Sequence, residues 1–173
     1  IYTQTTIEEY VDVEILAQIS RSLYRLISYN EHVLVNEGEV EEAWVREGLS
    51  LVAMDLVGFG AVTHNDAWDY LDASHLYTLT GAEDEGAFST EPYGAQYLFF
   101  RWVTDVAGTD ALSGLVQTSE TGTDNIEAAL ADYIESASSG KKKGMRAKKK
   151  GGKDEEGSID MDELVLMWQV AML

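Results

Sequence analysis

Apolar residues recur at helical spacing along most of this chain, while strand-like alternation of apolar and polar residues is scarce. The clearest case is a helix expected over residues 7–29, one face of which carries Leu16, Ile19, Leu23, Leu26 and Ile27. Arg21 and Arg25 lie roughly opposite that apolar face. The pattern predicts a mainly α fold.

Six further helices are expected in the remainder of the chain. They are Val40–Val57, a helix from Asn65 or Asp66 to Leu79, Tyr93–Ala107, Thr109–Thr118, a helix from Thr123 or Asp124 to Ser136, and Ile159–Leu173. Composition divides the chain into a helical domain over residues 1–137, a basic Gly/Lys-rich linker over 138–158 and an amphipathic docking helix over 159–173.

The net charge of −19 is distributed unevenly along the chain. Residues 1–140 contain 25 of the 31 acidic residues and only four of the 12 basic ones, a formal charge of −21. Residues 141–153 contain the other eight basic residues and no acid. An acidic body without lysine repels nucleic acid, so we expect no nucleic-acid partner for it. The same composition suits a protein outside the cytoplasm, periplasmic or secreted.

The last segment ends while still apolar and must bury itself against something. We expect it to dock on a protein partner or a membrane-protein complex through Leu164, Val165, Met167, Trp168 and Met172. The basic run Lys141–Lys153 before it can be a solvated linker, a nuclear signal, a nucleic-acid tail or a contact with an anionic membrane surface. The segment is too short to span a bilayer.

Metal and ligand sites have few candidates. The chain has no cysteine and three histidines. One metal site can be drawn from His64, Asp69, Asp72 and His75, although acidic helices often produce such patterns. Tyr93 and Tyr97, one helical turn apart, can line a cleft or simply belong to the core. We therefore expect no metal and no cofactor.

Four motifs follow one another in a defined order. They are Leu26-Ile27-Ser28-Tyr29-Asn30, the stretch Glu41-Glu42-Ala43-Trp44-Val45-Arg46-Glu47-Gly48-Leu49-Ser50 with Asp55 after it, Tyr93-Gly94-Ala95-Gln96-Tyr97-Leu98-Phe99, and Gly122-Thr123-Asp124-Asn125-Ile126-Glu127-Ala128. In order and spacing, the chain from about Ile15 to Ser136 resembles the hyicolysin-type zinc metallopeptidases of the gluzincin clan. The resemblance implies the helical half of a zincin-like fold, with residues 1–137 as a peptidase-like domain and the remainder as a C-terminal extension.

The same resemblance implies where a zinc site would fall. A zincin helix carries His-Glu-x-x-His, in which two imidazoles bind zinc and the Glu activates a water molecule. The matching positions place the imidazoles at Arg21 and Arg25, the catalytic base at Ser22 and the third ligand at Glu47. A guanidinium has no lone pair for a metal, and a serine hydroxyl does not replace the carboxylate base. The motif thus predicts a vestigial metal site without catalytic residues.

Two arrangements of the arginines remain open. If the zincin geometry holds, Arg21 and Arg25 lie near Glu47, and an Arg–Glu–Arg cluster supplies positive charge where zinc sits in the family. Alternatively, both arginines face solvent.

A β-sheet precedes the metal helix in peptidases of this clan, whereas only about six residues precede the first expected helix here. The function expected is therefore that of a non-catalytic, peptidase-like domain. It would serve as a structural or protein-interaction subunit of a larger assembly, which can be membrane-associated. The alternatives are a zinc-dependent endopeptidase and a small-ligand binder that uses the former cleft.

Overall fold

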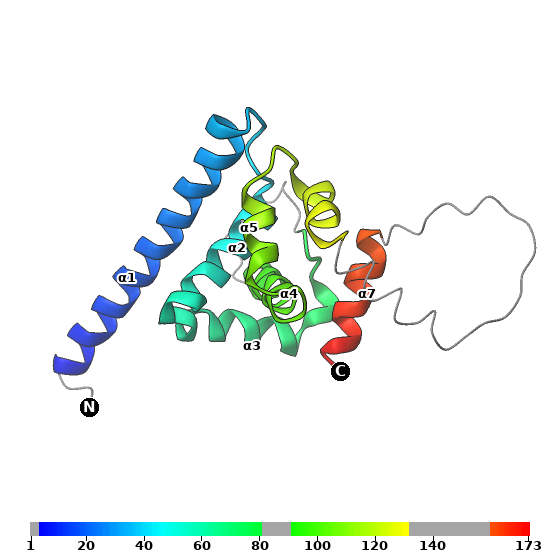
Figure 1. Cartoon of the computed structure of the whole chain (residues 1–173). Helices are drawn as coiled ribbons and strands as arrows, with labels where there is room; N and C mark the ends of the chain where they lie inside the picture. Colours follow the sequence, from blue (N-terminus) through cyan, green and yellow to red (C-terminus); the bar gives the residue numbers. More distant parts are fainter. Residues whose placement is uncertain (1–3, 81–90, 132–159) are drawn as a thin grey trace, which may run out of the picture.

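The computed structural model describes residues 4–80, 91–131 and 160–173, and within these ranges it contains helices and no strand (Figure 1). The mainly α prediction is confirmed. The linker expected over 138–158 lies outside the described residues, as do the ends of the segments that border it.

The helices follow the sequence pattern with shifted ends. They are α1 (Gln4–Tyr29), continued by the π-helical turn η1 (Asn30–Val35), α2 (Ala43–Met54), the short turns η2 (Asp55–Phe59) and η3 (Gly60–Thr63), α3 (His64–Asp72), η4 (Ser74–Leu76), α4 (Glu91–Ala107), α5 (Thr109–Val116), a helical segment over 122–131, and α7 (Met161–Ala171). The second helix therefore starts at Ala43 and not at Val40, and the third stops at Asp72 before a separate 3₁₀ turn.

The apolar helix α4 forms the centre of the fold and contacts α2, α3, α5 and α7 (Figure 1). Phe99 and Phe100 on α4 are completely buried, and both rings pack against Trp44 of α2. Gly48 allows this close approach, because a Cβ atom at that position would overlap the Phe100 ring. The core is thus built around the junction of α2 and α4.

The C-terminal helix α7 packs on this core (Figure 1). Its side chain Trp168 is 2% exposed, stacks on Tyr70 of α3 with ring centroids 6.2 Å apart and meets Phe99 edge-on at 5.5 Å. Asp160 caps the helix by accepting a hydrogen bond of 3.1 Å from the Glu163 N–H. The segment therefore completes the core of its own chain.

Helix α1 lies along one edge of the molecule, and the other helices lie to one side of it (Figure 1). Its inner face, which contacts α2, buries Ala17 and Ser28. The opposite face, called here the outer face of α1, consists of five large side chains, each between 48% and 67% exposed: Ile15, Leu16, Ile19, Leu23 and Leu26. Ile27 is also half exposed, but it borders a pocket that it shares with Leu49 of α2 and Leu112 of α5. The helix therefore turns its polar side toward the body and its apolar side outward, the reverse of the usual arrangement.

Candidate functional site

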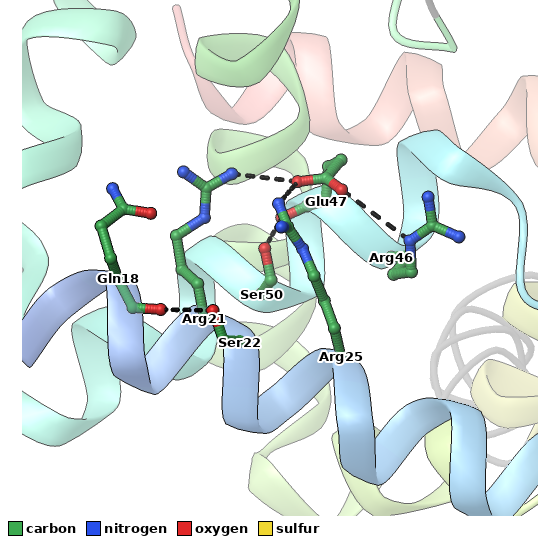
Figure 2. A network of polar contacts seen from close by, with 7 residues as sticks. All are labelled: Gln18, Arg21, Ser22, Arg25, Arg46, Glu47 and Ser50. Atoms are coloured by element: carbon green, nitrogen blue, oxygen red, sulfur yellow. Dashed lines mark hydrogen bonds and ion pairs between the residues drawn. The ribbon is translucent and has the colours of Figure 1, made fainter.

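Two arginines of α1 and one glutamate of α2 form an ion-pair cluster between these helices (Figure 2). The Arg21 Nη2 atom donates to Glu47 Oε2 at 2.9 Å, and Arg25 Nη2 donates to the same oxygen. The side chains of Arg21 and Glu47 are each 15% exposed, whereas that of Arg25 is 40% exposed. Of the two arrangements open from the sequence, the structure has the Arg–Glu–Arg cluster.

Neighbouring groups hold the cluster in place. Arg46 Nε lies 3.8 Å from Glu47 Oε1, so a third guanidinium approaches the same carboxylate (Figure 2). The Arg21 guanidinium lies over the Tyr93 ring, 5.8 Å from its centroid, in a cation–π contact. The arrangement puts three cations around one anion and links α1, α2 and α4.

The fourth residue of the expected vestigial site does not join the cluster. Ser22 is exposed, and its hydroxyl donates to the Gln18 carbonyl of the preceding turn at 2.8 Å (Figure 2). The Ser22 hydroxyl therefore bonds to the backbone of its own helix and not to the Glu47 carboxylate. The structure thus brings Arg21, Arg25 and Glu47 together and leaves Ser22 apart.

A second polar cluster, centred on Glu41, was missed by the sequence analysis, which placed this residue at the start of a helix. Glu41 is 3% exposed. Its Oε1 accepts hydrogen bonds from the Glu42 N–H at 2.8 Å and the Gly122 N–H at 2.7 Å, and its Oε2 accepts one from Asn125 Nδ2 at 2.6 Å. The Asn125 amide also donates to the Leu115 carbonyl at 2.8 Å. This buried carboxylate ties the segment before α2 to α5 and the 122–131 segment.

His32 and Tyr24 extend the Glu41 cluster toward α1. The His32 side chain is 1% exposed, and its Nε2 atom lies 3.7 Å from Glu41 Oε2. The pKa of Tyr24 is raised, first by burial and then by the negative charge of Glu41. Burial of an acid is hard to anticipate from one sequence, since Glu is almost never fully buried without partners. The available signal was that Glu41, Gly122 and Asn125 all fall within the quoted motifs.

A third polar cluster, around Asp55, lies where α2 ends. Asp55 Oδ2 accepts from Arg101 Nη1 at 2.8 Å and from the Tyr97 hydroxyl at 3.1 Å. Burial and then the charge of Asp55 raise the pKa of Tyr97. Tyr97 therefore belongs to a contact between η2 and α4, while Tyr93 supports Arg21.

The remaining candidate residues are placed as follows. His64, Asp69, Asp72 and His75 are all exposed along α3 and η4, and the part of the chain that the structure describes contains no group of three or more potential metal ligands. Among the proposed docking residues, Leu164 and Trp168 are buried in the core of this chain, and Val165, Met167 and Met172 are half-buried. Across the described ranges, no helix has both the length and the apolarity to cross a membrane.

Comparison of the chain with protein-family models, with curated proteins and with solved structures gives no match. The resemblance to zinc metallopeptidases therefore rests on the motifs quoted from the sequence. It is carried forward as a proposal.

Proposed function

We propose that this chain is a non-catalytic, peptidase-like domain that serves as a protein-interaction subunit. The observation that carries the proposal is the orientation of α1, whose five large apolar side chains on the outer face point away from the body. Contiguous apolar patches of this kind on a soluble domain are typical of sites where another molecule docks.

The chemistry of the ion-pair cluster favours the non-catalytic alternative. At the positions that the resemblance assigns to zinc ligands, two permanently charged guanidinium groups share the carboxylate of Glu47. Neither group donates a lone pair, and the carboxylate that is left is already the acceptor of both. A zinc peptidase would need two imidazoles and a catalytic carboxylate in these places.

The proposed interaction surface lies on α1 and not on the apolar side of α7. Leu164 and Trp168 of α7 are engaged within the domain, so they are not free to hold a partner as well. We retain an extracytoplasmic location as part of the proposal, because the acidic and lysine-free composition of residues 1–140 suits it.

The interaction proposal can be tested with a photo-crosslinking amino acid placed at Leu23, expressed in the cell of origin. We expect a discrete covalent adduct, since Leu23 lies in the middle of the outer face of α1 and is 55% exposed. The same amino acid at Trp68, which is 65% exposed on α3, is the control and should give none. Equal labelling at both positions, or no adduct at Leu23, would contradict the proposal.

The absence of catalysis needs its own test. The purified chain is dialysed against zinc, and bound metal and hydrolysis of an unstructured protein substrate are measured. We expect neither stoichiometric zinc nor chelator-sensitive hydrolysis. Hydrolysis that disappears in Glu47→Gln would establish the zinc endopeptidase instead.

A further inference from the structure

The residue types along α1 are arranged symmetrically about the position of Arg21, and this arrangement indicates which molecule covers the outer face. Ser20 and Ser22 are one residue before and after Arg21, and Ile19 and Leu23 are two residues before and after it. Leu16 and Leu26 are five residues before and after Arg21, and Ile15 and Ile27 are six residues before and after it. All of these apolar residues except Ile27 belong to the outer face of α1 and are between 48% and 67% exposed. The face therefore reads nearly the same in both chain directions.

A face with this property is complementary to itself. In a two-fold symmetric contact the same patch is used by both copies, and each residue meets the counterpart related to it by the axis. An antiparallel pair of α1 helices with its axis at the level of Arg21 sets Leu16 against Leu26 of the partner and Ile19 against Leu23 of the partner. The spacing of these four residues, three then four then three, is the repeat that packs one helix against another.

The distribution of charge agrees with a second copy and with the antiparallel direction. Within residues 15–30 the only charged groups are Arg21 and Arg25, and both are engaged with Glu47 on the inner face. The contact would therefore bring no like charges together at its centre. In a parallel pair, by contrast, Glu14, which borders the outer face, would lie beside its own copy, which is unfavourable.

We propose that a second copy of this chain covers the outer face of α1, in an antiparallel helix pair centred at the level of Arg21. This inference rests on the proposed function and names its partner. A lipid surface fits the face less well, because interfacial helices carry free Lys or Arg beside the apolar stripe and α1 has none. The stripe is about 20 Å long. That is short of a standard protein–protein interface, so the expected dissociation constant is micromolar, roughly 1–100 μM.

The stoichiometry is tested with the purified full chain by sedimentation velocity and light scattering between about 5 μM and about 500 μM, which brackets the expected dissociation constant. The mass should rise from 19.1 kDa toward twice that value. Leu23→Glu should weaken association at least roughly tenfold, because it places a charge beside the partner's apolar side chains. Val170→Glu, at a residue 63% exposed on α7, is the matched control and should leave association unchanged.

The direction of pairing is tested by disulfide formation, since the chain has no cysteine of its own. Leu16→Cys and Leu26→Cys are prepared as separate proteins. The antiparallel pair predicts that a mixture of the two forms a cross-linked dimer, while neither protein does so alone, because two equivalent positions would lie about 15 Å apart. Cross-linking of each protein with itself would show a parallel pair and overturn this geometry.

The two proposals fail in different ways. A chain that stays monomeric over the whole concentration range overturns the second copy as the partner. The photo-crosslink at Leu23 then decides the proposed function: an adduct with another protein retains it, and no adduct removes it. Circular dichroism of Leu23→Glu, and its thermal melting at a protein concentration well below the expected dissociation constant, should match those of the unaltered chain, since the residue is half exposed and lies outside the core.

Discussion

At the scale of single residues, Glu47 is the common acceptor of two guanidinium groups. Glu47→Gln leaves Arg21 and Arg25 close together without a compensating charge, so we expect a loss of about 1–2 kcal/mol of unfolding free energy, or roughly 3–6 °C in Tm. The measurement is thermal denaturation at low ionic strength. Glu120→Gln, at an exposed position, is the control and should melt like the unaltered chain. An unchanged Tm for Glu47→Gln would show that the cluster does not help to hold α1 on α2.

Glu41 should matter more than Glu47, because its carboxylate is almost completely buried and accepts three hydrogen bonds. In Glu41→Gln an NH₂ group must face at least one of these donors, which leaves a buried N–H unpaired. We expect a loss of about 2–3 kcal/mol, measured by urea denaturation. Glu39→Gln, two residues earlier and exposed, should change the stability by less than about 0.5 kcal/mol. Equal effects at the two positions would contradict the Glu41 cluster.

Because of Tyr24, we expect the free energy of unfolding to fall at alkaline pH. Burial raises its pKa in the folded state above the value of about 10 in the unfolded chain. The folded state therefore holds the phenolic proton more tightly. The resulting stability is complete below about pH 10 and is lost as pH rises toward the folded pKa. At pH 11 the unfolded chain gains about 1 kcal/mol relative to the folded one from this residue.

The experiment for Tyr24 is urea denaturation at pH 8 and pH 11. The unaltered chain should lose stability between the two, and Tyr24→Phe should lose less, by about the amount assigned to this residue. Tyr70 and Tyr97, whose pKa values are also raised by burial, contribute to the dependence that remains in Tyr24→Phe. The same pH dependence in Tyr24→Phe and the unaltered chain would contradict the assignment.

At the scale of whole elements, α7 behaves as part of the core. Trp168→Ala removes a ring that stacks on Tyr70 and meets Phe99, and we expect a loss of about 3–5 kcal/mol. Leu166→Ala on the same helix, at a residue 59% exposed, should cost less than about 0.5 kcal/mol. Chemical denaturation of both variants makes the comparison. A small effect of Trp168→Ala would mean that α7 is a detachable docking element, as the sequence had suggested.

The sequence predicted the bounds of the helices better than it predicted which face of each helix is turned toward the body. Helical periodicity located α1, α2, α4 and α5 to within a few residues, because it depends on local spacing alone. Periodicity also placed Arg21 opposite the apolar stripe of α1, but it does not say which side of the helix faces the body. That choice depends on tertiary contacts, here the attraction between two arginines and Glu47 and the fit of small residues against α2.

The site shows the same limit. The motif resemblance offered a contact between Glu47 and the two arginines as one of two arrangements, and the structure contains that contact. The resemblance also placed Ser22 in the vestigial metal site, whereas its hydroxyl bonds to the backbone of its own helix. It gave no indication that Glu41 would be buried with Gly122 and Asn125, since their contact joins residues about 80 positions apart. Apolar composition alone likewise could not tell that Trp168 docks within the chain.

At the scale of the whole molecule, the net charge of −19 opposes both folding and self-association. Raising NaCl from about 0.05 M to about 0.5 M shortens the Debye length from more than 10 Å to less than 5 Å, which screens repulsion among acids spread over the surface. The cluster around Glu47 is partly buried and is screened less. We therefore expect Tm to rise by a few degrees with salt.

Salt should also tighten the proposed α1 pair, because two bodies of like charge would approach each other and no ion pair would cross the contact. The expected result is a severalfold lower dissociation constant at the higher salt concentration, measured by sedimentation velocity. Leu23→Glu, which we expect to be monomeric, separates the effect of salt on folding from its effect on association. Its Tm should still rise with salt. Any part of the rise that depends on protein concentration in the unaltered chain should be lost in this variant. Potassium chloride should act like sodium chloride if screening is the cause. An association that weakens with salt would indicate a contact held by opposite charges, which the uncharged outer face of α1 does not provide.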